Sequence, residues 1–204
     1  MKELLQALET QRWDDHRYYH HSRINQTLHF VSAASFLTAY ALLFAYPVAA
    51  ALIGWLVAMT TRQIGHFFFE PRGFDEINGA SFDEKERIKI GFNLRRKVIL
   101  FSSWLLVPLT LALSPSFFGL FASWHDRASY LHSLGVLWLA LAGAGLLGRT
   151  LFLAVTRSPK TGFVWFTKIL TDPFHDVMIY YKSPYWLLKG QMLDPMEHVR
   201  VAHE

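Results

Sequence analysis

The chain has 204 residues, of which 52% are hydrophobic and only 18% are charged, whereas a soluble domain carries about 25% charged residues. This composition excludes a disordered chain and an ordinary soluble enzyme, and the 17 Phe, 7 Trp and 8 Tyr residues are typical of a membrane protein. Cysteine is absent, which excludes disulfides, zinc–cysteine sites and a thiol nucleophile. Any metal ligand must therefore come from His, Asp or Glu.

The N-terminal segment, residues 1–25, is polar and charged, and it predicts an amphipathic helix at the membrane surface. We expect no signal peptide, because no short apolar core is followed by a cleavage site of small residues. The segment carries three histidines, His16, His20 and His21.

Four apolar stretches are close to the length of about 20 residues that a helix needs to cross a bilayer. They are residues 28–46, 48–68, 98–113 and 131–155. Because Pro47 alone separates the first two, we expect them to form a tight helical hairpin, and the other two to form a second. The sequence therefore predicts an all-α integral membrane protein, in which residues 1–204 form a single domain with four transmembrane helices in two hairpins and with amphipathic or interfacial helices on the cytoplasmic side.

The basic residues set the expected orientation of this protein. Of the 20 Lys and Arg residues, only Arg127 lies between the third and fourth predicted spans. The positive-inside rule then places both termini and residues 70–96 in the cytoplasm, at a bacterial inner membrane or the endoplasmic reticulum. Topology thus explains the net charge of +4, and we expect no nucleic-acid partner. The cluster Arg95-Arg96-Lys97 is interpreted as a cytoplasmic anchor that attracts membrane lipid.

The C-terminal segment, residues 156–204, is predicted to lie in the interface, because charged residues interrupt its apolar stretch. Asp172-Pro173 predicts the start of a helix, with Asp as the N-cap and Pro at the first helical position. Aromatic residues beyond it, Tyr180 among them, are expected to anchor the segment in the interface.

The chain contains ten histidines, which is the feature of its composition that most requires an explanation. We expect His125 and His132 on the far side of the membrane, and His198 and His203 in the polar tail. The other six come from three segments that the topology places at one membrane depth: His16, His20, His21, His29, His66 and His175. Ionisable residues near a span are costly and usually functional, so this pattern predicts a metal centre. Imidazole and carboxylate ligands suit iron, manganese or zinc, and oxygen chemistry on an apolar substrate favours iron.

Helical spacing narrows the set of candidate ligands. His16 and His20 are four residues apart, as are His66 and Glu70, so each pair lies on one face of a helix. His175 belongs to a segment that returns to the same interface. A neighbouring carboxylate, such as Asp176, can orient a ligand imidazole through its other ring nitrogen.

His20 and His29 are nine residues apart, which corresponds to about 180° around a continuous helix. They can share an ion only if the chain breaks between them, and we expect such a break near Asn25. Otherwise only one of them binds. His21, Asn25 and His29 would by contrast follow one face of an unbroken helix, and spacing does not decide between the two sets.

The run Tyr19-His20-His21-Ser22-Arg23-Ile24-Asn25-Gln26-Thr27-Leu28-His29 resembles the Tyr-His-x4-Asn-x3-His signature of a membrane family. That family includes the iron-dependent 2-hydroxy fatty acid dioxygenases of fatty acid α-oxidation. Gly65-His66 followed by Glu70 resembles its second signature, Gly-His-x3-Glu, at the end of the next span. The resemblance covers residues 17–108, about half of the chain.

The resemblance implies a reaction that adds dioxygen to a 2-hydroxy fatty acid and shortens the acyl chain by one carbon. It also implies that His20, His29 and His66 bind Fe2+, and the spacing adds His16 and His175 as further candidate ligands. Glu70 is then a ligand or a supporting group, and Asn25 positions backbone or substrate. The candidates for binding the substrate carboxylate as a charge-assisted pair are Arg62, Arg23 and Arg72, each of which also fits a positive-inside anchor.

Two features depart from the family pattern. Residues 71–96 form a long charged loop, and residues 171–176 match no part of the signature. Two alternatives therefore remain. The first is a di-metal membrane fatty acid or lipid hydroxylase or desaturase, since His16-x3-His20-His21 resembles one of their histidine boxes. The second is a non-enzymatic membrane protein that binds metal or lipid.

Overall fold

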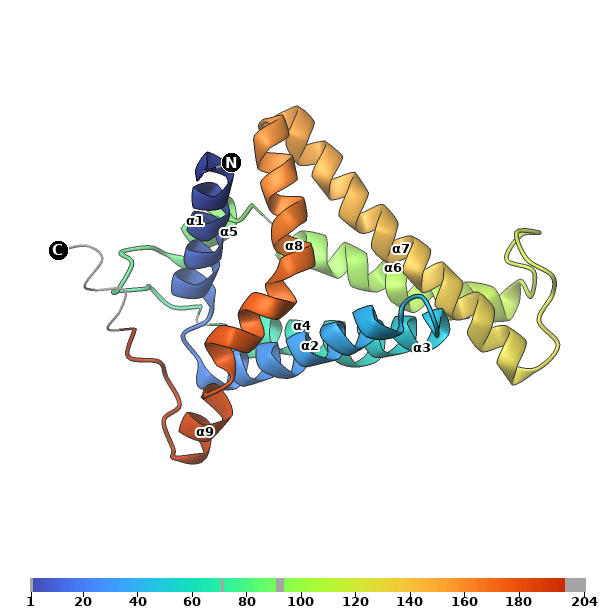
Figure 1. Cartoon of the computed structure of the whole chain (residues 1–204), viewed down its shortest axis with the longest axis horizontal. Coiled ribbons are helices and arrows are strands. Elements are labelled where there is room, and N and C mark those ends of the chain that lie inside the picture. The colour runs from blue at the N-terminus through green and yellow to red at the C-terminus, as the bar shows by residue number, and fades with distance from the viewer. Residues whose placement is uncertain (1, 71, 91–93, 197–204) are drawn as a thin grey trace.

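The computed structural model describes residues 2–70, 72–90 and 94–196, and all regular elements in this part of the chain are helices (Figure 1). The elements are α1 (Lys2–Tyr19), α2 (Arg23–Leu42), α3 (Pro47–Leu52), the π-helix η1 (Ile53–Met59), α4 (Thr60–Phe68), α5 (Phe82–Ile88), α6 (Leu94–Leu113), α7 (Arg127–Thr156), α8 (Pro159–Tyr180) and α9 (Ser183–Leu188). The polar N-terminal segment thus forms the predicted helix, and the all-α class is confirmed for the described residues.

Three helices in the described part of the chain are long and apolar enough to cross a membrane. They are Pro47–Phe68, which joins α3, η1 and α4, then Arg95–Leu113 and Arg127–Thr156. Large apolar side chains on α6 and α7, such as Leu109 and Leu151, are exposed, as expected for helices that face lipid. These properties indicate a membrane protein.

Helix α2 is not among these three candidate spans. Its first two turns carry Arg23, Asn25, Gln26 and His29, which lower the apolar character of the stretch predicted as the first span. The structure therefore supports the membrane class, while the topology of four spans in two hairpins stays a proposal. Pro47 does begin a new helix after α2, at the first position of α3.

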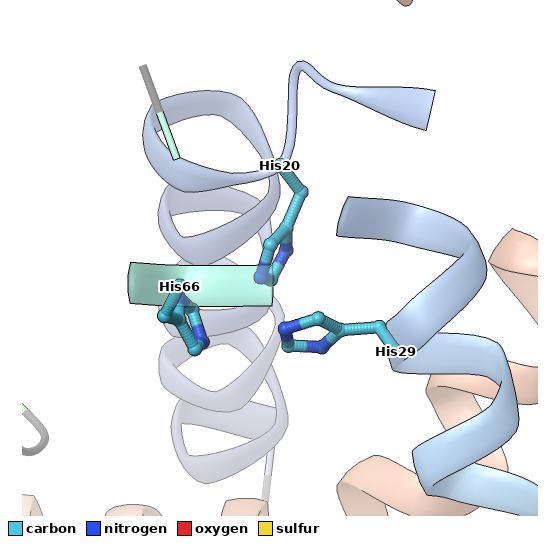
Figure 2. A group of neighbouring side chains, drawn as sticks. All are labelled: His20, His29 and His66. Carbon is cyan, nitrogen blue, oxygen red and sulfur yellow. The ribbon is translucent and has the colours of Figure 1, made fainter. Parts of the chain in front are cut away.

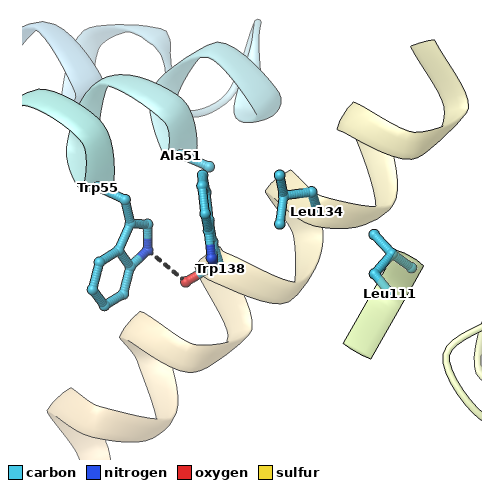
Figure 3. Close-up of a cluster of buried hydrophobic side chains, with 5 residues drawn as sticks. All are labelled: Ala51, Trp55, Leu111, Leu134 and Trp138. Atoms are coloured by element: carbon cyan, nitrogen blue, oxygen red, sulfur yellow. Dashed lines mark hydrogen bonds between the residues drawn. The ribbon is translucent and has the colours of Figure 1, made fainter. Parts of the chain in front are cut away.

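Aromatic packing joins the candidate span Pro47–Phe68 to the other two (Figure 3). Trp55 on η1 and Trp138 on α7 are buried, and the indole Nε1 of Trp55 donates a hydrogen bond of 2.9 Å to the backbone oxygen of Trp138. Trp104 on α6 stacks on Trp55, with ring centroids 6.0 Å apart. Such pairs bury large apolar surfaces in fixed relative geometry, so they set the position of η1 and α4 against α6 and α7.

Helix α8 corrects the reading of Asp172-Pro173 as a helix start. The helix begins instead at Pro159, after Ser158 as N-cap, and continues through Pro173 to Tyr180. A proline inside a helix costs about 3 kcal/mol or more, and this cost is offset here because α8 packs closely on both α2 and α7. Tyr180 is not an interfacial anchor either, since it is only 1% exposed.

The contacts of α2 determine where the polar residues of several helices come together. Helix α2 packs against α8, α4 and η1, and α1 packs against α8. The beginning of α2, the end of α4 and the second half of α8 therefore meet beside the connection between α1 and α2, toward the left in Figure 1. The connection between α6 and α7 lies at the opposite end of the molecule.

Candidate metal centre

Three histidines from separate elements converge at this meeting point. His20 lies in the connection between α1 and α2, His29 lies on α2, and His66 lies in the last turn of α4. One ligand nitrogen of each lies within 4.8 Å of those of the others. Figure 2 shows the three rings pointing toward a shared space, and their centroids are separated by 4.1, 5.4 and 4.8 Å.

A break in the helix makes this convergence possible. Helix α1 ends at Tyr19 and α2 begins at Arg23, after Ser22 as N-cap, so His20 and His29 do not belong to one continuous helix. The break comes a few residues earlier than the position near Asn25 that the sequence indicated. The buried side chains of Asn25 and Gln26 stabilise it, since their amides donate to the backbone oxygens of Tyr19 and His20 at 2.9 and 2.8 Å.

His21 points away from the other imidazoles. Its Nε2 contacts the backbone oxygen of Arg17 and lies 3.6 Å from a carboxylate oxygen of Asp75, in the loop that precedes α5. Of the two sets that the spacing left open, the structure therefore forms the one that contains His20 and His29. The face through His21, Asn25 and His29 does not assemble.

The second ring nitrogen of each imidazole faces a polar side chain. His20 Nδ1 lies 2.7 Å from the hydroxyl of Tyr180, and His66 Nδ1 lies 2.8 Å from Glu70 Oε2. His29 Nδ1 is 3.5 Å from Asp176 Oδ2, which is an electrostatic contact longer than a normal hydrogen bond. Metal-binding histidines commonly have such a partner on the other nitrogen, because it fixes the tautomer and the ring orientation.

Two nitrogens that face the shared space have no hydrogen-bond partner among the described residues. They are Nε2 of His20 and Nε2 of His29, and both are buried. Leaving a buried polar atom unpaired costs about 1–3 kcal/mol. A metal ion bound to Nε2 would satisfy these atoms, and the set of three imidazoles fits iron, manganese or zinc.

Burial also sets the charge of the groups outside the candidate spans. It lowers the pKa of His20 well below the ordinary value, so this imidazole is neutral at pH 7 and able to bind a metal. Burial raises the pKa of Tyr180, which keeps its hydroxyl protonated beside His20. Burial raises the pKa of Glu70 as well, against the opposing charges of Lys89 and Lys97.

Helix α8 contributes a polar stripe to the centre. Asp172, Asp176 and Tyr180 are spaced four residues apart, and all three are buried. Arg62 on α4 donates a hydrogen bond of 3.0 Å to Asp176. Burial alone would raise the pKa of Asp176, but the charge of Arg62 and the contact with His29 overcome this effect and hold it below its usual value. An ionised carboxylate therefore lies beside His29.

Gly65 allows the two motifs to pack closely. A side chain at this position would collide with the carboxamide of Asn25 and would touch the ring of His29. The absence of a side chain at Gly65 therefore allows α4 to approach Asn25 this closely. The Asn25 amide donates a hydrogen bond to the backbone oxygen of Tyr19 at the end of α1, whereas a contact with substrate stays a prediction.

The other predicted metal ligands lie outside the group of three. His16 Nδ1 is 3.0 Å from the hydroxyl of Tyr180, so this residue contacts His20 indirectly. His175 is half-buried on α8 and is not among the three imidazoles that share the centre. His198 and His203 lie outside the described residues.

The three predicted carboxylate-binding arginines have different environments. Arg23 pairs with Asp194 at 3.0 Å, and Arg72 donates to the backbone oxygen of Phe67 on the surface. Of these three arginines, Arg62 is the one that lines the cavity beside His66. Its guanidinium already forms an ion pair with Asp176.

A cavity of about 450 Å3 adjoins the centre, within the range of about 300–1,000 Å3 that is typical of small-molecule sites. His66, Arg62 and Gln63 line its polar part, together with charged residues such as Lys97 and Lys168. The apolar walls include residues of α2, α3, η1, α6, α7 and α8. The arrangement thus places candidate metal ligands next to a space suited to an apolar ligand.

Sequence reasoning missed two residues at this site, Tyr180 and Lys97. The four-residue spacing of Asp172, Asp176 and Tyr180 could have indicated that Tyr180 faces the site. This inference requires that α8 continues through Pro173, which the sequence did not predict. Lys97 lines the cavity and is buried rather than serving as a surface anchor.

No protein-family model, curated protein or solved structure matches this chain. The relation to the 2-hydroxy fatty acid dioxygenases therefore depends on the two short motifs. The structure brings the histidines of both motifs, His20 and His29 from the first and His66 from the second, into one group.

Proposed function

We propose that this protein is a membrane-bound, iron-dependent dioxygenase that acts on 2-hydroxy fatty acids and shortens the acyl chain by one carbon. The observation that supports this function best is the group of three imidazoles, two buried and one partly buried, beside a largely apolar cavity. A hydrophobic substrate can enter such a cavity from the membrane, and its polar end then lies close to the imidazoles.

In this proposal His20, His29 and His66 hold Fe2+. When bound, the iron supplies the redox chemistry that the reaction of dioxygen with a 2-hydroxy acid requires. The overall balance closes without a further reductant: a 2-hydroxy acid and dioxygen give the acid one carbon shorter, carbon dioxide and water. The bond that breaks joins the carboxyl carbon to the carbon that carries the hydroxyl.

The residues around the imidazoles keep them ready to bind. Glu70 accepts the Nδ1 proton of His66, the Tyr180 hydroxyl contacts Nδ1 of His20, and Asp176 lies beside Nδ1 of His29. In this proposal each Nδ1 carries the ring proton, so that Nε2 of each ring is unprotonated and can bind the metal. Burial of the centre excludes bulk water from the reacting atoms.

The proposed topology extends the three candidate spans by α2, which gives four spans with both termini in the cytoplasm. The centre then lies at the cytoplasmic face of a bacterial inner membrane or of the endoplasmic reticulum. Reporter fusions at the termini and in the connection between α6 and α7 test this orientation. A cytoplasmic signal from residues 114–126 would contradict it.

Metal analysis and turnover of the purified full-length protein test the function. We expect about one iron per chain, and dioxygen consumption with 2-hydroxypalmitate that yields the acid one carbon shorter. His20→Ala, His29→Ala and His66→Ala should each lower bound iron and abolish turnover, whereas His125→Ala and His132→Ala should leave both unchanged. Full iron and turnover in two of the first three variants would contradict the ligand assignment.

The same measurements separate the alternatives. Two irons per chain would favour a di-metal hydroxylase or desaturase, although the described residues contain a single group of three candidate metal ligands. Bound metal without dioxygen consumption would favour a non-enzymatic protein that binds metal or lipid.

A further inference from the structure

Lys97 is a buried basic residue that forms no salt bridge with a described residue, although the charges of Glu70 and Glu86 act on it from a greater distance. It lies on α6, is only 6% exposed and lines the cavity beside the metal centre. Among the described residues no carboxylate lies within ion-pair distance of its ammonium group, and no hydrogen bond to it is formed. A buried charge without an ion-pair partner is costly. An anionic group from outside the chain would therefore stabilise Lys97.

The other cations of the cavity wall are all neutralised. Arg62 pairs with Asp176, and Lys89 lies 3.3 Å from both Glu70 and Glu86. Lys168 pairs with Asp15 and Asp172 at 2.5 and 2.6 Å.

The carboxylates of the wall are neutralised as well. Asp15 and Asp172 bind Lys168, and Asp14 pairs with Arg17 at 2.8 Å. Lys97 is therefore the charged residue of the cavity wall that forms no salt bridge with a described residue, and it is basic. The part of the cavity beside Lys97 is thus suited to the negatively charged group of a ligand.

The shape of the cavity indicates what carries that charge. Its lining extends along the candidate span Pro47–Phe68, from His66 and Arg62 to Ala50. The 12 residues from Arg62 to Ala50 correspond to about 18 Å of helix. The far part is lined by apolar residues such as Leu43, Trp55 and Leu139. A ligand that fills it has a long apolar tail and a polar end near Lys97.

We infer that Lys97 binds the anionic head group of a single-chain amphiphile whose tail occupies the apolar part of the cavity. The carboxylate of a fatty acid fits this description, and Lys97 then replaces the three arginines proposed from the sequence. The inference rests on the proposed function for the identity of the substrate. Its binding test, however, requires neither metal nor turnover, so either proposal can fail alone.

Equilibrium binding to the metal-free, full-length protein in a non-ionic detergent tests the inference. The assay measures how well palmitate, hexadecanol and hexadecyl phosphate compete with a bound fluorescent fatty acid. We expect the wild type to bind palmitate at least tenfold more tightly than hexadecanol, a difference of about 1.4 kcal/mol. Lys97→Met should remove this preference by weakening palmitate binding while hexadecanol binding stays within about twofold.

Two further variants control for charge and position. Lys97→Arg keeps the charge and should retain most of the preference, whereas Arg95→Met removes an exposed charge on the same helix and should change nothing. Lys97→Met should also raise the melting temperature of the empty protein, because it removes an unpaired buried charge. A residue with a purely structural role would show a lower melting temperature instead.

Several outcomes would overturn the inference. One is a Lys97→Met protein that still prefers palmitate, and another is an equal loss of affinity for palmitate and hexadecanol. Hexadecyl phosphate that binds as tightly as palmitate would support an anion site and show that it does not select for carboxylate. Palmitate binding that depends on Lys97, in a protein without dioxygenase turnover, would leave this inference intact and refute the proposed function.

Discussion

His20 Nδ1 and the hydroxyl of Tyr180 lie 2.7 Å apart, although the two residues are separated by 160 positions in the chain. The same hydroxyl lies 3.0 Å from Nδ1 of His16. Tyr180 thus ties the connection between α1 and α2 to the end of α8. Because His20 is in a connection and not in a helix, this contact limits the rotation of its ring.

Tyr180→Phe should lower metal affinity by about 10–100-fold, the range found when a group that orients a ligand histidine is lost. The substitution removes the hydroxyl and keeps the ring, so the fold should be retained. Metal titration with Zn2+ or Co2+ measures the effect. Tyr181→Phe is the matched control, because the neighbouring Tyr181 is exposed and its substitution should leave the affinity unchanged. Equal affinities for wild type and Tyr180→Phe would show that the contact does not orient His20.

Gly65→Ala should abolish metal binding even though it adds a single methyl group. The new Cβ would collide with the carboxamide of Asn25, next to the ring of His29. Either α4 moves away from α2, which displaces His66, or Asn25 releases the backbone oxygen of Tyr19. Overpacking of this kind costs about 1–3 kcal/mol, so the melting temperature should fall as well.

Gly148→Ala on α7 is the control for Gly65→Ala. A Cβ at Gly148 meets no atom within 4 Å, and alanine is favoured over glycine inside a helix by up to about 1 kcal/mol. We therefore expect normal metal binding and equal or higher stability. A Gly65→Ala protein with normal metal affinity would mean that the two motifs tolerate separation.

Much of the centre could be predicted from the sequence, because its signals are local. The i, i+4 spacing of His66 and Glu70 correctly placed a carboxylate beside this imidazole, at 2.8 Å. The pairing of His20 with His29 required a helix break, and the sequence placed that break near Asn25. In the structure Ser22 is the N-cap of α2, so the break lies before it. Serine is a preferred N-cap residue, so the sequence did contain a signal for the position of the break.

The contribution of α8 could not be predicted with the same certainty, because it depends on packing. Asp172-Pro173 and Ser158-Pro159 are both N-cap and proline pairs, and only the second begins a helix. Local propensity does not distinguish them. Burial of α8 against α2 and α7 offsets the cost of an internal proline, and the continuous helix then directs Asp176 and Tyr180 toward the histidines. Lys97 was missed for a similar reason, since one basic residue in a cluster of three is buried and its neighbour Arg95 is exposed.

Metal binding should stabilise the protein. The three imidazoles come from α2, α4 and the connection between α1 and α2, so an ion that binds all three links elements that are separate in the unfolded chain. At a free metal concentration of 100 times Kd, we expect about 2.7 kcal/mol of added stability. Thermal melting in detergent with and without Fe2+ under anaerobic conditions measures this shift. His29→Ala should abolish it, whereas His21→Ala should retain it, since His21 contacts Arg17 and Asp75 instead. A shift that persists in His29→Ala would place the ion elsewhere.

Acidification should destabilise the metal-free protein, and His20 should account for part of the effect. Burial lowers the pKa of His20 in the folded state, while in the unfolded chain it returns to about 6.5. Below that pH the unfolded state binds more protons than the folded state, so the free energy of unfolding decreases as the pH falls. Asp176 does not contribute in this range, because its folded-state pKa is lowered from an already acidic value. Melting temperatures measured between pH 7.5 and 5.5 should therefore decrease for the wild type, and the slope should be smaller for His20→Gln. Identical slopes for the two proteins would show that His20 is accessible to protons in the folded state, against its burial between α1 and α2.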